Sequence, residues 1–451
     1  MIKKSVAGAA LFCILALSLS PAEGRAEERK ISLTEAITTA LGENHEIRAF
    51  GHALSAQREE VGISRSLLLP RISFEERFMR TNNPVYAFMG KLNQERFQAS
   101  DFALSSLNDP KAITDFQTSL SFEQPLYERK AYIGLEISKK ELKAKEEEFS
   151  RKKEEISFRV IRTWLMVHTA KEYVNAAEKG LEDAKEHLRI AELRADSGLG
   201  LYSDTLRAST ALTGAEQRLV SSRKELDVSQ RALGLLLGME SSVDITGDLP
   251  DLPLRDMEAY TTESVSRADL KAGEIRSRNA KNSVKMAEAG YFPSLGIGGS
   301  YQLNDNSTPF GSEGTSWQVT AFLRWNLFDG TRREHERSKA KFQVAEAEAE
   351  LSGMKNSVSF RVYEAYQRVQ EAKKNAELAR KSLQTSEEGQ RLVRVRYENA
   401  LSPIVDLLDA QLTLDSSRAG LVARENDYRL SVVNLEYESG SLLRNMGTEN
   451  K

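Results

Sequence analysis

The sequence contains little that would cross-link the chain or break it into short elements. Its 451 residues include a single cysteine, Cys13, and only ten prolines. One thiol excludes a disulfide framework within the chain, and the scarcity of proline favours long helices over many short elements joined by turns. After the first 30 residues, no stretch approaches the roughly 18 apolar residues that a membrane-spanning helix needs.

The first residues have the pattern of a secretory signal peptide. A basic pair, Lys3 and Lys4, precedes an uncharged apolar stretch, and small residues follow as far as Ala26. We therefore expect residues 1–26 to be a cleaved leader. The residues before Cys13 lack the small side chains that a lipoprotein signal places there, so lipidation is not expected.

Neither charge nor motifs indicate nucleic acid, a metal, a cofactor or catalysis. The chain has 63 basic and 66 acidic residues and a net charge of -3, which cleavage of the leader would change to -5 by removing three basic residues and one acidic residue. A polyanionic partner is therefore not expected. The five histidines are scattered without a metal-ligand pair, and no glycine-rich phosphate loop is present.

The chain repeats itself. Residues 45–74 align without a gap on residues 268–297 at an offset of 223, and the tetrapeptide SFRV at residue 157 recurs at an offset of 202. At this second offset Asp204 falls on Asp406. We therefore predict a tandem duplication, with a first repeat over residues 27–240, a linker over residues 241–262 and a second repeat over residues 263–451.

Within each repeat the spacing of apolar residues changes from helical to alternating. The helical pattern that starts at Ile31 stops at Pro70, because proline lacks an amide donor and disfavours helix in the residue before it. Alternating stretches follow, which indicate strands. The predicted strands cover about residues 71–80, 114–125, 294–303 and 317–327.

Very long helical stretches follow each strand pair. Residues 126–196 and 327–399 contain no proline and would each extend about 100 Å as helices. Short breaks separate them from further helices at about residues 202–237 and 403–443. Helices of this length exceed an ordinary globular domain and need partners along their whole length.

The four predicted strands of a secreted chain allow two interpretations. They fit an outer-membrane β-barrel with one face toward lipid and one toward water, or two hairpins that cap a helical bundle. The duplication favours the barrel, since both repeats place a strand pair at one end of the long helices. Four strands cannot close a barrel, so several chains must share one. The residues expected to face the membrane are Phe116, Leu120, Phe122, Trp317, Val319, Leu323 and Trp325.

In this order of elements the sequence resembles the TolC-type outer-membrane efflux proteins. The resemblance covers essentially the whole mature chain. It rests on the opening ISLTEAITTALGEN, the helix-to-strand junctions LLLPRISF and YFPSLGIGGSY, the strand-to-helix junctions FEQPLYERKAY and WNLFDGTRREH, and RYENALSPIVDLLDAQLTL. Each motif is modest alone, but their order is specific.

The resemblance implies a mostly α fold with membrane β-barrel strands. In this family a homotrimer builds a twelve-stranded barrel in the outer membrane, which continues as a long α-helical barrel across the periplasm and carries an equatorial belt. The resemblance also implies a passive conduit without a cofactor. Its partners would be a periplasmic adaptor (membrane fusion) protein and an inner-membrane pump of the RND, MFS or ABC type, for efflux or type I secretion.

The family's architecture assigns roles to the breaks and loops. Residues 81–113 and 304–316 would face the cell exterior, and residues 241–262 would join the equatorial belt. The breaks between the long and the returning helices would be helical tips that form the periplasmic entrance and contact the adaptor. These tip residues are Gly198, Leu199, Gly200, Ala400, Leu401, Ser402 and Pro403.

Acidic residues near the second tip are candidates for the pore constriction. Asp406 and Asp409, with Asp204 in the first repeat, match positions where the family places acids at the narrow mouth, and threefold symmetry would turn each into a ring of carboxylates that selects cations. Alternatively, Ser402 is an N-cap, with Pro403 at the first helical position and acids near the positive end of the helix dipole. This alternative explains Asp406 better than Asp409.

The gating scheme of the family does not transfer directly. The first repeat has Arg207 where Asp409 falls, so a ring of this kind differs between the repeats. Some family members carry an arginine at the position of Ser402 that helps to hold the entrance shut, and serine cannot form those ion pairs.

A periplasmic coiled-coil adaptor or scaffold is the alternative function. Such a protein is also secreted and built from helical hairpins, but it would have one hairpin flanked by lipoyl-like and β-barrel segments. Two repeats with a strand pair in each favour the channel.

Overall fold

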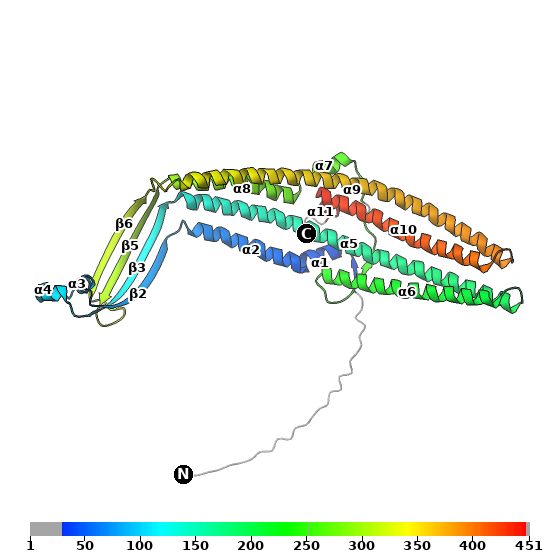
Figure 1. Cartoon of the computed structure of the whole chain (residues 1–451), viewed down its shortest axis with the longest axis horizontal. Helices are drawn as coiled ribbons and strands as arrows, with labels where there is room; N and C mark the ends of the chain where they lie inside the picture. The colour runs from blue at the N-terminus through cyan, green and yellow to red at the C-terminus, as the bar shows by residue number, and fades with distance from the viewer. Residues whose placement is uncertain (1–28, 251, 448–451) are drawn as a thin grey trace, which may run out of the picture.

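The computed structural model describes residues 29–250 and 252–447, so the predicted leader and Cys13 lie outside the described residues. A β-sheet lies at one end of the molecule, and two helical tips lie at the other (Figure 1). Long helices connect the two ends. In the described ranges, every helix is too short or too polar to traverse a bilayer.

The long helices α5 (Arg129–Asp196) and α9 (Arg332–Glu398) contain 68 and 67 residues, which corresponds to about 100 Å each. The shorter helices α2 (His45–Ser66) and α8 (Ala268–Glu288) pack beside them in the half near the sheet. The returning helices α6 (Tyr202–Leu236) and α10 (Ile404–Ser439) pack beside them in the half near the tips (Figure 1). Both long helices therefore have partners over their whole length, as their sequence requires.

The largest apolar core lies midway along the molecule, in the region that we call the belt. Trp164 of α5 is fully buried there, against Ile37 of α1 (Leu33–Glu43), Leu233 of α6 and Val433 of α10. This core joins both repeats, because α1 and α6 come from the first and α10 comes from the second.

A small parallel sheet completes the belt. β1 (Arg29–Ser32) pairs with β4 (Val243–Thr246), and α7 (Met257–Ser264) follows in the segment predicted as the linker. The prediction of helix from Ile31 was wrong at its start, because Ile31 pairs with Ile245 and Ser32 caps α1 by accepting a hydrogen bond from the Glu35 amide at 3.3 Å.

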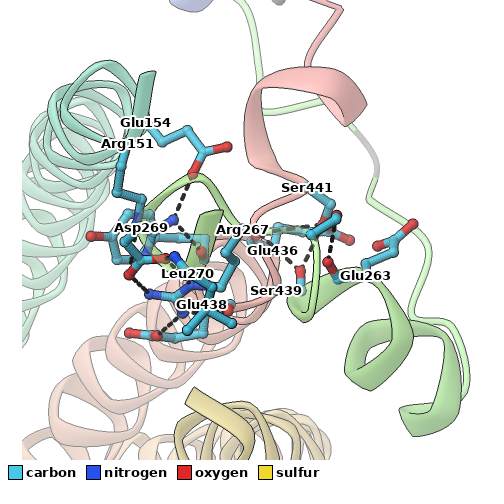
Figure 2. Close-up of polar contacts among 12 residues, drawn as sticks. Arg151, Glu154, Glu263, Arg267, Asp269, Leu270, Glu436, Glu438, Ser439 and Ser441 are labelled. Atoms are coloured by element: carbon cyan, nitrogen blue, oxygen red, sulfur yellow. Dashed lines mark hydrogen bonds and ion pairs between the residues drawn. The ribbon is translucent and has the colours of Figure 1, made fainter. Parts of the chain in front are cut away.

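Buried polar groups hold the end of α10 in the belt. The Glu436 carboxylate, almost fully buried, accepts hydrogen bonds from the Tyr260 hydroxyl (3.2 Å), from the Ser441 hydroxyl and from Nδ2 of Asn445 in α11 (Leu442–Asn445) at 2.7 Å. Figure 2 shows this carboxylate beside a second cluster around Arg267. Such charges are stable in the interior only because each has several partners.

Equivalent glycines end α6 and α10 at the belt. Gly238 and Gly440, which the second offset of the repeat aligns, have left-handed φ angles of 79° and 73°. A β-carbon would lie 2.8 Å from the Glu43 carbonyl oxygen at the first position and 2.7 Å from Cγ of Arg267 at the second. Glycine is required at both positions by the backbone conformation and by the close approach of a neighbouring segment.

Among the described residues, four strands form the large sheet, in the order β2-β3-β5-β6, with every neighbouring pair antiparallel. They are β2 (Arg71–Thr81), β3 (Ile113–Tyr127), β5 (Ser294–Asp305) and β6 (Gly314–Arg324). In this part of the chain, β2 and β6 are edge strands with one unpaired side each.

The last strand begins and ends earlier than predicted, so the assignment of Trp325 to a strand was wrong. β6 ends at Arg324 because Arg324 pairs with Ser294, the first residue of β5 after Pro293. Trp325 instead donates a hydrogen bond from its ring nitrogen to the Tyr291 carbonyl at 3.1 Å. It therefore fixes the junction between sheet and helices.

The loop predicted over residues 81–113 contains helices. These are α3 (Pro84–Asn93), the 3₁₀ turn η1 (Ala99–Phe102) and α4 (Leu104–Asn108). Asn83 caps α3 by accepting from the amides of Val85 and Tyr86, and Pro84 suits the first helical position.

Candidate functional site

The two faces of the large sheet differ in chemistry. The register places Phe74 opposite Leu120, Leu120 opposite Tyr301, and Tyr301 opposite Trp317, so these side chains share one face. Ser73, Ser121, Ser300 and Gln318 line up in the same way on the other face. We refer to these as the apolar face and the polar face.

The predicted membrane-facing residues lie on the apolar face, with the exception of Trp325. This face also contains Ile72, Phe78, Ile297 and Leu303 with Phe116, Leu120, Phe122, Val319 and Leu323. Trp317 and Ile72 expose 75% and 74% of their surfaces in the single chain. So large an exposed apolar surface indicates an interaction with lipid or another protein.

The helical tips share one backbone geometry. The chain turns after α5 at Gly198, with a φ of 71°, and after α9 at the equivalent Ala400, with a φ of 62°. At both tips the next amide donates back to the last helical turn, from Leu199 to the Arg194 carbonyl (2.9 Å) and from Leu401 to the Arg396 carbonyl (2.8 Å). This is the hydrogen-bond pattern of a Schellman motif, which reverses the chain in few residues.

The predicted tip residues lie at the end of the molecule farthest from the sheet (Figure 1). Leu199 and Leu401 occupy equivalent positions and expose 72% and 69% of their surfaces. Leu201 and Tyr202 are similarly exposed beside the first tip. Each tip therefore presents apolar side chains to its surroundings.

The structure corrects the predicted cap of α10. Pro403, with an extended ψ of 160°, is the N-cap residue, and the helix begins at Ile404. The Ser402 hydroxyl does not accept from a backbone amide but donates to Oδ2 of Asp406 at 2.8 Å. Asp406 lies in the first turn of α10, and Asp204 lies at the equivalent place in α6.

Asp409 and Arg207, which align in the two repeats, line one groove. The groove has a volume of about 400 Å³ and lies between α6 and α10 over α5. Its floor includes small residues, Gly180 and Ala184. Asp409 is exposed and forms no ion pair within the described part of the chain, so its carboxylate is available to solvent ions.

Arg194 links the two tips, which the sequence did not predict. Its guanidinium lies 4.5 Å from the centre of the Tyr397 ring and donates to the Tyr397 carbonyl, while a second nitrogen donates to the Leu199 carbonyl at 3.2 Å. Tyr397 is 1% exposed, and its burial raises the pKa of its hydroxyl. The only sequence signal is an arginine and a tyrosine in the last turns of α5 and α9.

A buried polar network lies below the tips. Gln411 of α10 donates to Oδ2 of Asp183 (3.0 Å) and Oδ1 of Asp415 (2.9 Å), and its carbonyl oxygen lies 3.0 Å from His187 Nε2. Burial raises the pKa of Asp415 above its usual range, although Gln411 and nearby arginines favour the charged form. Arg418 donates to Asp183 at 2.7 Å. The network joins α5 and α10, and thus the two hairpins.

In residues 29–250 and 252–447, no group of three His, Cys, Asp or Glu side chains is arranged to hold a metal ion.

Comparison with known proteins identifies what this arrangement resembles. A family model described as "Outer membrane efflux protein" matches residues 36–239 and 260–441. The chain is 23% identical over 421 residues to the outer membrane protein TolC of Vibrio cholerae, covering 86% of this chain and 87% of that protein. It is 20% identical over 447 residues to the proteases secretion protein PrtF of Dickeya chrysanthemi, covering 96% and 92%.

Solved structures show the same fold. The Campylobacter jejuni CmeC outer membrane channel has a TM-score of 0.75 and 17% identity, over 91% of this chain and 86% of that chain. VceC, an outer membrane protein of Vibrio cholerae, has a TM-score of 0.73 and 17% identity over 90% and 96%. The predicted fold class, a mostly helical chain with a few strands of the helical-barrel channel type, is confirmed.

Proposed function

The chain belongs to the outer membrane efflux protein family, and we propose that it acts as a trimeric, passive conduit between periplasm and exterior, in a tripartite efflux or type I secretion system. Its class is therefore an outer-membrane efflux or secretion channel, and the periplasmic adaptor interpretation is not retained. In this proposal the leader, residues 1–26, is cleaved, and the mature chain carries no lipid.

One observation supports a barrel shared by several chains, a number that the family resemblance sets at three: the sheet has an apolar face and a polar face, but two open edges. A β-structure in lipid must close on itself, because unpaired backbone amides and carbonyls have no water to bind. The sheet of one chain is too small for closure. Three chains give twelve strands when β2 of each copy pairs with β6 of the next. The first repeat (27–240) and the second (263–451) each supply one strand pair and one hairpin.

The helical tips form the periplasmic entrance in this proposal. Exposed Leu199 and Leu401 would contact a periplasmic adaptor, with Gly198, Gly200, Ala400, Ser402 and Pro403 shaping the turns. An inner-membrane pump supplies the energy. Asp409, with Asp406 and Asp204 nearer the tip, would form rings of carboxylates that favour cations.

A disulfide between neighbouring chains tests the closure. The predicted mature chain has no cysteine, so pairs can be introduced into β2 and β6 without competition. Several cysteine pairs on these edges test the pairing register between neighbouring chains. The first pair is Ser73→Cys with Gln318→Cys, and further pairs move one of the two cysteines along its strand. Oxidation should give covalent trimers extracted from the outer membrane only by detergent.

The matched control places the same cysteines inside the sheet. Ser121→Cys with Ser300→Cys lies on adjacent strands of one chain, so its disulfide should leave the subunits separate. Release of the protein by osmotic shock, or a monomer for every edge pair, would overturn the proposal.

A further inference from the structure

The segment between β2 and β3 lies at the end of the sheet that is remote from the helical tips, which we call the outer end (Figure 1). Gly90, near the end of α3, is buried, and a side chain at this position would overlap Ile113 of β3. A side chain at Gly314 of β6 would overlap the Asn93 carbonyl. Glycine at both positions lets α3 lie directly against the strands.

A buried hydrogen-bond cluster fixes α3 there. Gln94, the C-cap residue of α3, is 1% exposed and donates from Nε2 to Oδ1 of Asp115 and to the Thr114 carbonyl, each at 2.8 Å. Asn304 of β5 donates to both Asp115 carboxylate oxygens at 3.0 Å. Bonds to a buried carboxylate are among the stronger hydrogen bonds, so α3 is held firmly.

The strand register identifies the face on which α3 lies. Asp115 and Gln117 share the polar face with Ser121, because side chains at alternate positions of a strand point the same way. Gln117 pairs with Asn304, and Asn304 pairs with Gly314. α3 therefore lies on the polar face.

The loop between β5 and β6, at the same end of the sheet, contacts the apolar face. Phe310 stacks on Phe74 with ring centres 6.2 Å apart, and its amide donates to Oε1 of Glu76 at 3.3 Å. Phe74 and Glu76 belong to the apolar face. The two loops thus separate to the two sides of the barrel wall, and only the α3 segment lies on the side that faces water in the proposed channel.

The exposed side of α3 is apolar. Val85, Met89 and Leu92 follow one another at the spacing i, i+4 and i+7, and expose 67%, 49% and 42% of their surfaces. Ala87 and Gly90, on the other side of the helix, are buried. We call Val85, Met89 and Leu92 the α3 stripe.

The size of the barrel places the three copies of α3 close together. Twelve strands spaced about 4.8 Å apart and tilted about 40° enclose a backbone cylinder roughly 24 Å across. A helix with its side chains is about 10 Å across, so three of them nearly fill that cross-section. Threefold symmetry turns the same side of each helix toward the axis.

We propose that α3 constricts the outer end of the channel, with the α3 stripes of the three copies meeting around the axis. The inference rests on the trimeric barrel proposed above. The α3 stripe of each copy therefore contacts a second copy of the chain. The resulting constriction is apolar, and an apolar constriction restricts conduction by excluding water. The cluster of Gln94, Asp115 and Asn304 holds each helix in place.

Cross-linking tests the contact between copies. Met89→Cys in the outer-membrane protein, treated with a short bismaleimide, should give a covalently linked pair of chains on a denaturing gel. The matched control is Leu104→Cys on α4, which is 77% exposed and lies outside the α3 stripe. No linked pair with Met89→Cys, or equal linking by the control, would overturn the contact.

Conductance in a planar bilayer tests the constriction itself. The triple variant Val85→Ser, Met89→Ser and Leu92→Ser changes only exposed side chains, so the fold should persist, and its conductance should rise about two-fold or more as the constriction becomes wetted. Leu104→Ser should match the parent protein. Equal conductance of the triple variant and a conducting parent would overturn the constriction but leave the channel intact. A parent protein that forms no channels would overturn the proposed function as well.

Discussion

Asn44 and Arg267, which the first offset of the repeat aligns, hold equivalent positions and make equivalent hydrogen bonds. Each precedes the first residue of a helix near the sheet, α2 or α8. Asn44 donates to the Leu236 carbonyl at 2.8 Å, and Arg267 donates to the Glu438 carbonyl at 2.6 Å. Leu236 and Glu438 are themselves aligned by the second offset. The first offset therefore relates the two donors and the second offset relates the two acceptors, so each repeat forms the same contact at the belt.

Replacing these two residues should have unequal effects. Arg267 is 3% exposed and also pairs with Asp269 (2.7 Å) and Glu438 (2.9 Å), as Figure 2 shows. Arg267→Ala leaves Asp269 and Glu438 with only their longer ion pairs, to Arg151 (3.9 Å) and Arg361 (3.6 Å), and should lower the free energy of unfolding by about 2–3 kcal/mol. Asn44→Ala removes a cap and a hydrogen bond and should lower it by about 1–2 kcal/mol.

Urea unfolding followed by far-ultraviolet circular dichroism measures both changes. The control is Arg278→Ala, an exposed arginine of α8, for which we expect a change below about 0.5 kcal/mol. An Arg267→Ala effect no larger than that of Arg278→Ala would contradict a structural role of the cluster.

Loss of Arg194 should loosen the tips. Arg194→Ala removes the contact with the Tyr397 ring and the hydrogen bond to its carbonyl, and should lower the local stability of the second tip by about 1–2 kcal/mol. Hydrogen exchange of residues 396–403 measures this. Arg396, the equivalent residue, is exposed and forms no side-chain ion pair in the described residues, so Arg396→Ala should leave exchange nearly unchanged.

Ala400→Gly should stabilise the second tip. Alanine with a left-handed φ of 62° is strained, and glycine relieves about 1 kcal/mol of this strain. Gly198→Ala should have the opposite effect at the first tip. The Leu401 amide donates to the Arg396 carbonyl, and its hydrogen-exchange rate should fall in Ala400→Gly. A faster exchange rate in this variant would refute the prediction.

His168 should make stability depend on pH. Burial and the neighbouring Arg429 lower the pKa of His168, against the opposing influence of Glu172 and Asp248. The unfolded chain therefore binds this proton more tightly. The contribution of His168 is complete above the unfolded pKa of about 6.5 and is lost as the pH falls from there toward the lower folded pKa.

The variant His168→Phe, which keeps an aromatic ring beside Trp164, should unfold with a weaker pH dependence between about pH 5 and 7. Thermal unfolding across this range measures it. His45→Phe, at an exposed position, should retain the parent dependence, and an unchanged slope for His168→Phe would refute the assignment.

The acidic residues at the entrance should set ion preference. Asp409→Asn should lower the cation-to-anion permeability ratio by about two-fold or more if three carboxylates line the pore. Asp406→Asn should have a smaller effect, because Asp406 is engaged by Ser402. Reversal potentials in a salt gradient measure the ratio, and Asp227→Asn on α6 is the control. An unchanged permeability ratio in both Asp409→Asn and Asp406→Asn would contradict the proposed rings of carboxylates.

The sequence by itself determined the elements that depend on local chemistry. Alternation from Phe116 to Phe122 fixed a strand and its apolar face, because the side-chain period of a strand is two. The absence of proline between residues 129 and 196 allowed one unbroken helix. The second offset of the repeat predicted two similar tips, and Gly198 and Ala400 do share one backbone conformation.

Only the tertiary structure decided what depends on residues far apart in the chain. The pairing of Ile31 with Ile245, the contact of Arg194 with Tyr397 and the fold of α3 onto the polar face join segments that no local period relates. Ser402 illustrates the limit at short range, since its hydroxyl could cap the helix or bind Asp406, and the turn geometry selects Asp406. Local patterns fix the elements, whereas packing between them fixes their partners.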